Sequence, residues 1–278
     1  MLGNLLKKVL LGEPQLEREE APWFDLGEVL RARLYSEKIV PPPSEDVIYR
    51  ASGLGSLCER AEALKALHRI ESKQVVNPDL QIAFDMGHGF HHMVQNKWLG
   101  PIGLLLGNWT CNACGHLHED TVWPGICVKC HSRDDFTYQE FAFENKEIGL
   151  SGHPDGILVL PGGHRVLLEI KTANSKAFDY LLTYIKGPMP QHVSQVQAYM
   201  HFMKMQECHF LYVDKDRSQF LTYRIAYDEQ KFNVLVGKVA LIRNSIRSQT
   251  VPPRYVCSTI SCARAKRCSV RQKCFSTV

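Results

Sequence analysis

The pattern of apolar and polar residues predicts several helices. Apolar side chains recur every three or four positions in residues 52–69 and 79–98, which places them on one helical face. Pro, Glu and Ser are frequent in residues 13–25 and 38–46, as is typical of loops. The remaining expected helices are a short amphipathic one over Met1 to Leu11 and longer ones over 26–36, 191–203 and 228–247.

Apolar runs between these helices predict strands. Residues 136–143 alternate between apolar and polar, and the apolar runs 150–160 and 165–172 flank a Pro-Gly-Gly-His turn at 161–164, which predicts a hairpin. Two more strands are expected over 207–213 and 219–226. Mixed helices and strands of this kind indicate an α/β fold, in which helices flank a mixed central sheet.

The hairpin carries two acidic residues and a lysine. Asp155 stands in the sequence Gly-His-Pro-Asp-Gly at 152–156, and Glu169 and Lys171 stand in the facing strand. Side chains two apart on a strand share a face, so Glu169 and Lys171 project together while Ile170 points into the core. The hairpin can bring Asp155 beside them. The alternative interpretation is a surface Glu/Lys pair with an aspartate in a turn.

The register of this hairpin decides whether the three side chains meet. A plain four-residue loop at 161–164 would pair Asp155 with Ile170, which lies on the wrong face. One extra residue reverses the face, so an odd-length loop or a bulge would correct the pairing. We therefore expect an irregularity near 154–156 or in the turn, and Gly156 is a natural position for a bulge.

Two carboxylates on one surface suit a hard divalent cation. They repel each other unless a positive charge joins them, and Mg²⁺ and Mn²⁺ prefer oxygen ligands. Such a cation would polarise a phosphate and activate water. Lys171 would position that water or stabilise the charge that develops on the phosphate.

Composition and charge narrow the class of protein. The 278 residues are 45% hydrophobic and 22% charged, which is ordinary for a soluble globular protein. The net charge of +4 is too small to indicate nucleic-acid binding by itself, so any DNA contact would come from local basic patches. No apolar run approaches the roughly 20 residues of a membrane span, and no clear secretory signal precedes one. We therefore expect a cytoplasmic protein with no membrane association.

Ten cysteines in such a protein favour metal sites over disulfides. Two Cys-x-x-Cys pairs, separated by twelve residues, predict a zinc ribbon inserted at residues 109–133 with the ligands Cys111, Cys114, Cys127 and Cys130. The ribbon either stabilises a loop locally or binds DNA or a partner protein. Cys208 lies in an apolar stretch and is predicted to be an ordinary buried thiol.

The motif Gly-x-Pro-Asp-Gly…Leu-Glu-Ile-Lys-Thr resembles the core of the PD-(D/E)XK nuclease superfamily. Two further motifs resemble its RecB-like branch, namely Gly87…His91 and Gln195…Tyr199, each with four-residue helical spacing. The resemblance implies that Gln195 and Tyr199 help to hold DNA or the lysine. It also implies a metal site, for Mg²⁺ or for Mn²⁺, which imidazole suits well. The implied metal ligands are His91, Asp155, Glu169 and the carbonyl of Ile170, with His88 as a competitor of His91.

The remaining cysteines resemble those of iron–sulfur nucleases in this branch, the AddB-type nuclease domains and the CRISPR-associated adaptation exonucleases. In these proteins one cysteine before the core and three after it hold a [4Fe–4S] cluster. Here Cys58, Cys268 and Cys274 match. For the fourth ligand the sequence departs from the pattern, and Cys262 is slightly favoured over Cys257. The alternative is a zinc site of C-terminal cysteines alone, with Cys58 a buried thiol. Four basic residues of this tail either contact DNA phosphates or form only a solvated basic tail: Arg264, Lys266, Arg267 and Arg271.

The sequence thus predicts a metal-dependent DNA nuclease, more an exonuclease on single strands or ends than an endonuclease. The expected setting is recombination, repair, phage DNA metabolism or CRISPR adaptation in a bacterium, an archaeon or a phage-infected cell, with other recombination or adaptation proteins as partners. The rivals are a structure-specific endonuclease and a non-catalytic DNA-binding or scaffold subunit that keeps the fold. The expected division is an N-terminal segment at 1–50, a RecB-like nuclease domain at 51–278 and, within it, a cysteine-rich tail at 254–278.

Overall fold

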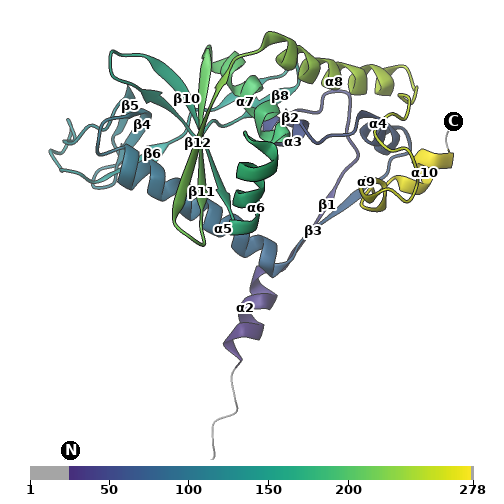
Figure 1. Ribbon diagram of the computed structural model, residues 1–278, viewed down its shortest axis with the longest axis horizontal. Helices are drawn as coiled ribbons and strands as arrows, with labels where there is room; N and C mark the ends of the chain where they lie inside the picture. Colours follow the sequence, from purple (N-terminus) through teal and green to yellow (C-terminus); the bar gives the residue numbers. More distant parts are fainter. Residues whose placement is uncertain (1–24, 277–278) are drawn as a thin grey trace, which may run out of the picture.

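A computed structural model describes residues 25–276 of the chain (Figure 1). Its centre is a mixed seven-stranded sheet in which only β10 and β11 run parallel. The strands follow the order β12 (Gln219–Ala226), β11 (Glu207–Asp214), β10 (Arg165–Ala173), β9 (Gly156–Val159), β4 (Leu105–Cys111) and β5 (Leu117–Thr121), and β6 (Phe136–Gln139) also pairs with β4.

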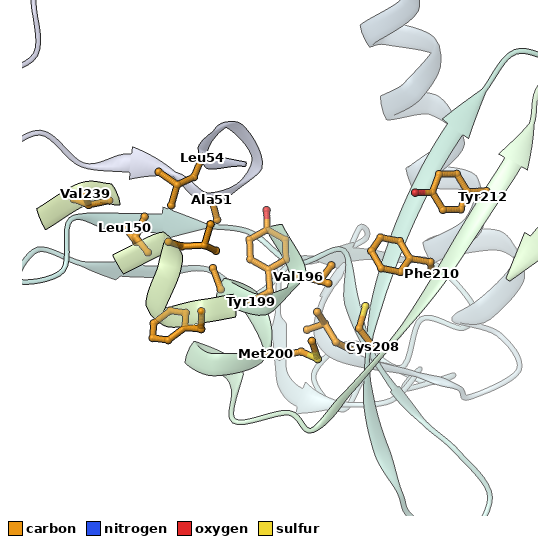
Figure 2. Close-up of a cluster of buried hydrophobic side chains, with 14 of the residues drawn as sticks. Ala51, Leu54, Leu150, Val196, Tyr199, Met200, Cys208, Phe210, Tyr212 and Val239 are labelled. Atoms are coloured by element: carbon orange, nitrogen blue, oxygen red, sulfur yellow. The ribbon is translucent and has the colours of Figure 1, made fainter. Parts of the chain in front are cut away.

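Apolar side chains on the two faces of β10 belong to two different cores. Leu167 packs in a core with Val196 and Met200 of α7 (Pro190–Met203) and with Val239 of α8 (Glu229–Arg247), part of which Figure 2 shows. Leu168 lies in the other core, with the π-helical segment η1 (Val94–Leu99) and the aromatic residues of β4 and β6. The strand is therefore buried on both faces from Val166 to Ile170, which explains the unbroken apolar run from Val166 to Leu168.

Smaller elements surround this centre. The C-terminal helices α9 (Ala263–Lys266) and α10 (Arg271–Ser276) lie beside α4 (Glu59–Leu67), far from β5 and β6 at the other end of the molecule (Figure 1). α5 leads directly into η1. The smaller elements are α2 (Leu26–Leu34), β1 (Ser36–Val40), β2 (Tyr49–Arg50), α3 (Ala51–Leu54), α4 (Glu59–Leu67), β3 (Ser72–Val76), α5 (Pro78–Met93), β7 (Phe143–Asn145), β8 (Leu150–Gly152), α6 (Ser175–Tyr180), the π-helical η2 (Leu181–Ile185), α9 (Ala263–Lys266) and α10 (Arg271–Ser276).

Most of the expected elements are confirmed, and four differ. The helix expected over 52–69 is two helices, α3 and α4, separated by a turn. The strand expected over 136–143 ends at Gln139, and β7 begins only at Phe143. β8 and β9 divide the long run 150–160 around Asp155. Part of the expected loop 38–46 is strand, because β1 pairs with β3. The helix expected over Met1 to Leu11 lies outside the described residues.

None of the helices in the described part of the chain has the length and apolar character needed to cross a bilayer.

Candidate active site

The β9–β10 hairpin brings the two acidic positions into line. Gly156 pairs with Leu168, and Val159 pairs with Arg165, so the connection at 160–164 has five residues. The predicted odd-length loop is therefore confirmed, and the next positions along the register are Asp155 and Glu169. Asp155 lies in the break between β8 and β9, and its carboxylate turns toward Ile170 of β10.

Asp155 is held from two sides. Its Oδ2 accepts a hydrogen bond of 2.5 Å from the backbone N–H of Ile170, and its Oδ1 lies 3.2 Å from Nδ1 of His91 on α5. Burial opposes a charge on the imidazole, but the bond to Asp155 and the nearby carboxylates raise the pKa of His91. His88, one turn earlier, is exposed. The structure thus brings His91, and not His88, to Asp155.

Glu169 and Lys171 form a buried ion pair. The carboxylate is fully buried, and its Oε1 lies 2.5 Å from Nζ of Lys171. Neither oxygen of Glu169 receives a well-directed hydrogen bond from a described residue. Burial and the neighbouring charge of Asp155 raise the pKa of the Glu169 carboxyl, while the two carboxylates raise the pKa of Lys171 against its own burial. A buried carboxylate with so few donors is suited to a cation.

Helix α7 presents the next two predicted residues to this pair. Nζ of Lys171 donates a hydrogen bond of 3.2 Å to Oε1 of Gln195, and Nε2 of Gln195 donates one of 3.0 Å to the hydroxyl of Tyr199. Tyr199 packs against Gly152, where an added Cβ would lie only 2.4 Å from the ring. Glycine at this position therefore lets the tyrosine approach the strand that precedes Asp155.

Sequence reasoning missed two residues of this site. Glu140 follows β6 directly, and its carboxylate forms, with His91 and Asp155, a group whose ligand atoms all lie within 4.8 Å of one another. Gln95 is almost fully buried and donates one hydrogen bond to Oε1 of Glu140 and another to the carbonyl oxygen of Asp155, both 2.8 Å long. Gln95 stands four residues after His91, and this helical spacing was the one signal that could have indicated it.

The residues present fit a divalent cation of the Mg²⁺ or Mn²⁺ type. The donor set consists of one imidazole and several carboxylate oxygens, and oxygen ligands are the ones that hard cations prefer. The oxygens of Glu169, which accept no well-directed hydrogen bond from a described residue, lie in the same region as Asp155 and Lys171. A cation here would join carboxylates that otherwise repel one another.

The four cysteines of the predicted ribbon converge beside the sheet. Sγ of Cys111 lies 3.6 Å from that of Cys130, and Sγ of Cys114 lies 3.7 Å from that of Cys127. All four sulfur atoms lie within 4.8 Å of one another. Cys111 is the last residue of β4, so the group is anchored to the central sheet. Four thiols at this spacing can hold one tetrahedral ion.

The other cysteines meet at the far end of the molecule. One cavity between α4 and the tail is lined by Cys58, Cys257, Cys268 and Cys274. Cys262 is not among the residues that line this cavity, but its thiol lies next to that of Cys257. Its Sγ also accepts a bond from the N–H of Ala265 at the start of α9. Cys208 lies elsewhere and is fully buried, as predicted.

Of the four basic tail residues, Arg264 donates to the carbonyl of Ser56 at 2.6 Å, and Arg271 lines the cysteine cavity. Lys266 closes α9, and Arg267 follows it directly.

No family model matches the chain, and no curated protein matches it. Among solved structures, an alkaline exonuclease from Laribacter hongkongensis, LHK-Exo, is 16% identical over 80% of this chain and 93% of its own, with a TM-score of 0.44, and one of its structures contains dAMP. A phage related exonuclease from Haemophilus somnus 129PT is 11% identical over 73% of this chain and 95% of its own, with a TM-score of 0.35.

Proposed function

We propose that this chain is a metal-dependent deoxyribonuclease that hydrolyses phosphodiester bonds. The observation that carries the proposal is the meeting of Asp155, from the break before β9, with Glu169 and Lys171 of β10. Gln195 of α7 is bonded to the lysine. A surface Glu/Lys pair would be solvated, whereas this carboxylate is fully buried. Burying charged groups is costly, so their presence here favours a functional site.

The cation ligands in this proposal are His91, Asp155, Glu169 and the carbonyl oxygen of Ile170. When bound, a divalent cation polarises the scissile phosphate and lowers the pKa of a bound water. Lys171 positions the attacking water or stabilises the negative charge that develops on the phosphate. Gln195 fixes the lysine, and Tyr199 fixes Gln195.

Single-stranded DNA or DNA ends are the proposed substrate, and exonuclease action is proposed over endonuclease action because of the resemblance to RecB-like nucleases. The proposed setting is recombination, repair, phage DNA metabolism or CRISPR adaptation. A non-catalytic DNA-binding subunit is the rival from another class, and a structure-specific endonuclease is the rival among enzymes.

The test is digestion of end-labelled single-stranded DNA with Mn²⁺, comparing the wild-type protein with Asp155→Asn and Lys171→Ala. We expect each substitution to lower the rate by at least about 10³-fold, because each removes a group that acts in the transition state. Equal rates in all three proteins would exclude the assigned site. A circular single strand separates the enzymes, since an exonuclease leaves it intact and an endonuclease cuts it.

Two further metal sites belong to the proposal. Zinc is proposed at Cys111, Cys114, Cys127 and Cys130, since two Cys-x-x-Cys pairs match its tetrahedral preference. A [4Fe–4S] cluster is proposed at Cys58, Cys268, Cys274 and Cys257. The shared cavity supports Cys257, whereas the sequence slightly favoured Cys262. The visible absorption spectrum of anaerobically purified protein, with its iron, sulfide and zinc content, tests both sites. A colourless protein with zinc alone would exclude the cluster.

The basic residues around the cluster are proposed as a phosphate-binding surface. These residues are Arg264, Lys266, Arg267 and Arg271.

A further inference from the structure

Glu140 occupies a place that the motifs of the chain do not account for. It follows the last residue of β6, and its side chain is partly buried and faces the helix that carries His91. Its nearest ligand atom, one from His91 and one from Asp155 form a single group within 4.8 Å. Glu169, by contrast, lies outside this group and pairs with Lys171.

Gln95 fixes the orientation of the Glu140 carboxylate. One amide hydrogen of Gln95 binds Oε1 of Glu140 and the other binds the backbone oxygen of Asp155, each at 2.8 Å. The amide is almost fully buried, so the contact holds Glu140 at a set distance from the break that carries Asp155. No described residue donates a hydrogen bond to Oε2 of Glu140, which leaves that oxygen free to bind a ligand.

The charges around this carboxylate are unbalanced. Asp155 and Glu140 are close enough to repel each other, and the nearby lysine is already engaged by Glu169 and Gln195. Among the described residues, the imidazoles of His91 and His153 are the remaining basic groups near Glu140. Glu169 is fully buried beside Asp155, and its oxygens accept no well-directed hydrogen bond from a described residue. Its one ion pair, with Lys171, leaves the charges of Asp155 and Glu140 without a lysine partner among the described residues.

We propose that Glu140 is a ligand of the divalent cation, together with His91 and Asp155. This inference rests on the proposed function, since it adds a ligand to the same site. The cation would bind Oδ1 of Asp155, the oxygen that faces His91, while Oδ2 keeps its bond to the backbone N–H of Ile170. In the simpler alternative, Glu140 only pairs electrostatically with a protonated His91 and binds no metal.

The test measures Mn²⁺ binding directly, without DNA, from the electron paramagnetic resonance signal of the free ion. Glu140→Gln keeps an acceptor for Gln95 but removes the charge, and we expect it to weaken Mn²⁺ binding by at least about 10-fold. Glu144→Gln is the matched control, because that side chain is exposed and lies 4.0 Å from Lys146. It should bind Mn²⁺ like the wild-type protein.

Wild-type affinity in Glu140→Gln would overturn the proposal, as would the absence of Mn²⁺ binding by the wild-type protein. The melting temperature in EDTA shows whether Glu140→Gln folds. If it does not, Glu140→Asp is used in its place. We expect Glu140→Asp to weaken Mn²⁺ binding as well, because its side chain is shorter by one methylene and its carboxylate lies farther from the cation. DNA hydrolysis is measured in parallel. If Mn²⁺ binding depends on Glu140 but the wild-type protein cleaves no DNA, the proposed function alone is contradicted. If the wild-type protein cleaves DNA and Glu140→Gln binds Mn²⁺ with unchanged affinity, the ligand assignment alone is contradicted.

Discussion

Nζ of Lys171 donates a hydrogen bond of 3.2 Å to Oε1 of Gln195, and this bond joins the central sheet to helix α7. The same ammonium lies 2.5 Å from Glu169, so it has one neutral and one charged partner. Gln195 is itself oriented by Tyr199. The position of the lysine is therefore determined by a chain of contacts, and not by the strand alone.

Replacing Gln195 by Ala should slow DNA hydrolysis by about 10- to 100-fold, because Lys171 would lose the partner that holds it over the reacting phosphate. The cation ligands stay in place, so Mn²⁺ affinity should not change. Steady-state kinetics at saturating Mn²⁺ and a separate Mn²⁺ titration give the two quantities. Ser194→Ala is the control, since that hydroxyl binds only the carbonyl of Pro190 among the described residues. Equal losses in both variants would contradict the prediction.

The sequence predicted most of the helices and strands, and it also predicted that the β9–β10 hairpin could not have a plain four-residue turn. Strict side-chain alternation showed that a four-residue turn would separate Asp155 from Glu169, and the hairpin has the odd-length connection that this argument required. The resemblance to RecB-like nucleases also indicated Gln195 and Tyr199, and their four-residue spacing predicted that both lie on one helical face.

Glu140 and the β1–β3 ribbon could not be predicted in the same way. Glu140 reaches the site only because β6 pairs with β4 and ends beside η1, which is a long-range relationship with no local pattern. In the β1–β3 pair, Val40 lies opposite Ser72, and two helices separate the two strands in the sequence. Neither strand therefore has its partner nearby in the sequence. Local periodicity reports which face of an element is buried, but it does not report which distant element covers it.

Cys257→Ser should remove the visible absorption of the purified protein, because Cys257 lines the cavity with Cys58, Cys268 and Cys274. Cys262→Ser should retain most of it, because that sulfur caps α9. Iron and sulfide analysis of both variants checks the spectra. The opposite ranking would assign the fourth ligand to Cys262. Cys208→Ala, which alters a buried thiol far from the cavity, should retain the full cluster.

Cys114→Ser should abolish binding of one zinc ion and disturb the aromatic core beneath the ribbon. Trp109 is fully buried two residues before Cys111, and its ring centre lies 4.9 Å from that of Trp123. Loss of the metal removes a constraint on this packing, so tryptophan emission should shift to longer wavelength. Zinc analysis and fluorescence, with Cys208→Ala as the control, measure both effects. Full zinc content in Cys114→Ser would refute the assigned ligand set.

His192 should make the protein less stable as the pH falls from 6.5 toward 4. Burial and the charge of Lys171 lower the pKa of His192 from 6.5 to about 4. The unfolded chain therefore binds a proton first, and the stability present above pH 6.5 is lost across this window, by at most about 3 kcal/mol. Urea unfolding at several pH values measures the loss. His192→Asn, which can still bond to Tyr212, should lose less, whereas His164→Asn in the exposed turn should follow the wild type. If the free energy of unfolding falls equally with pH in all three proteins, His192 is not the group responsible for the loss.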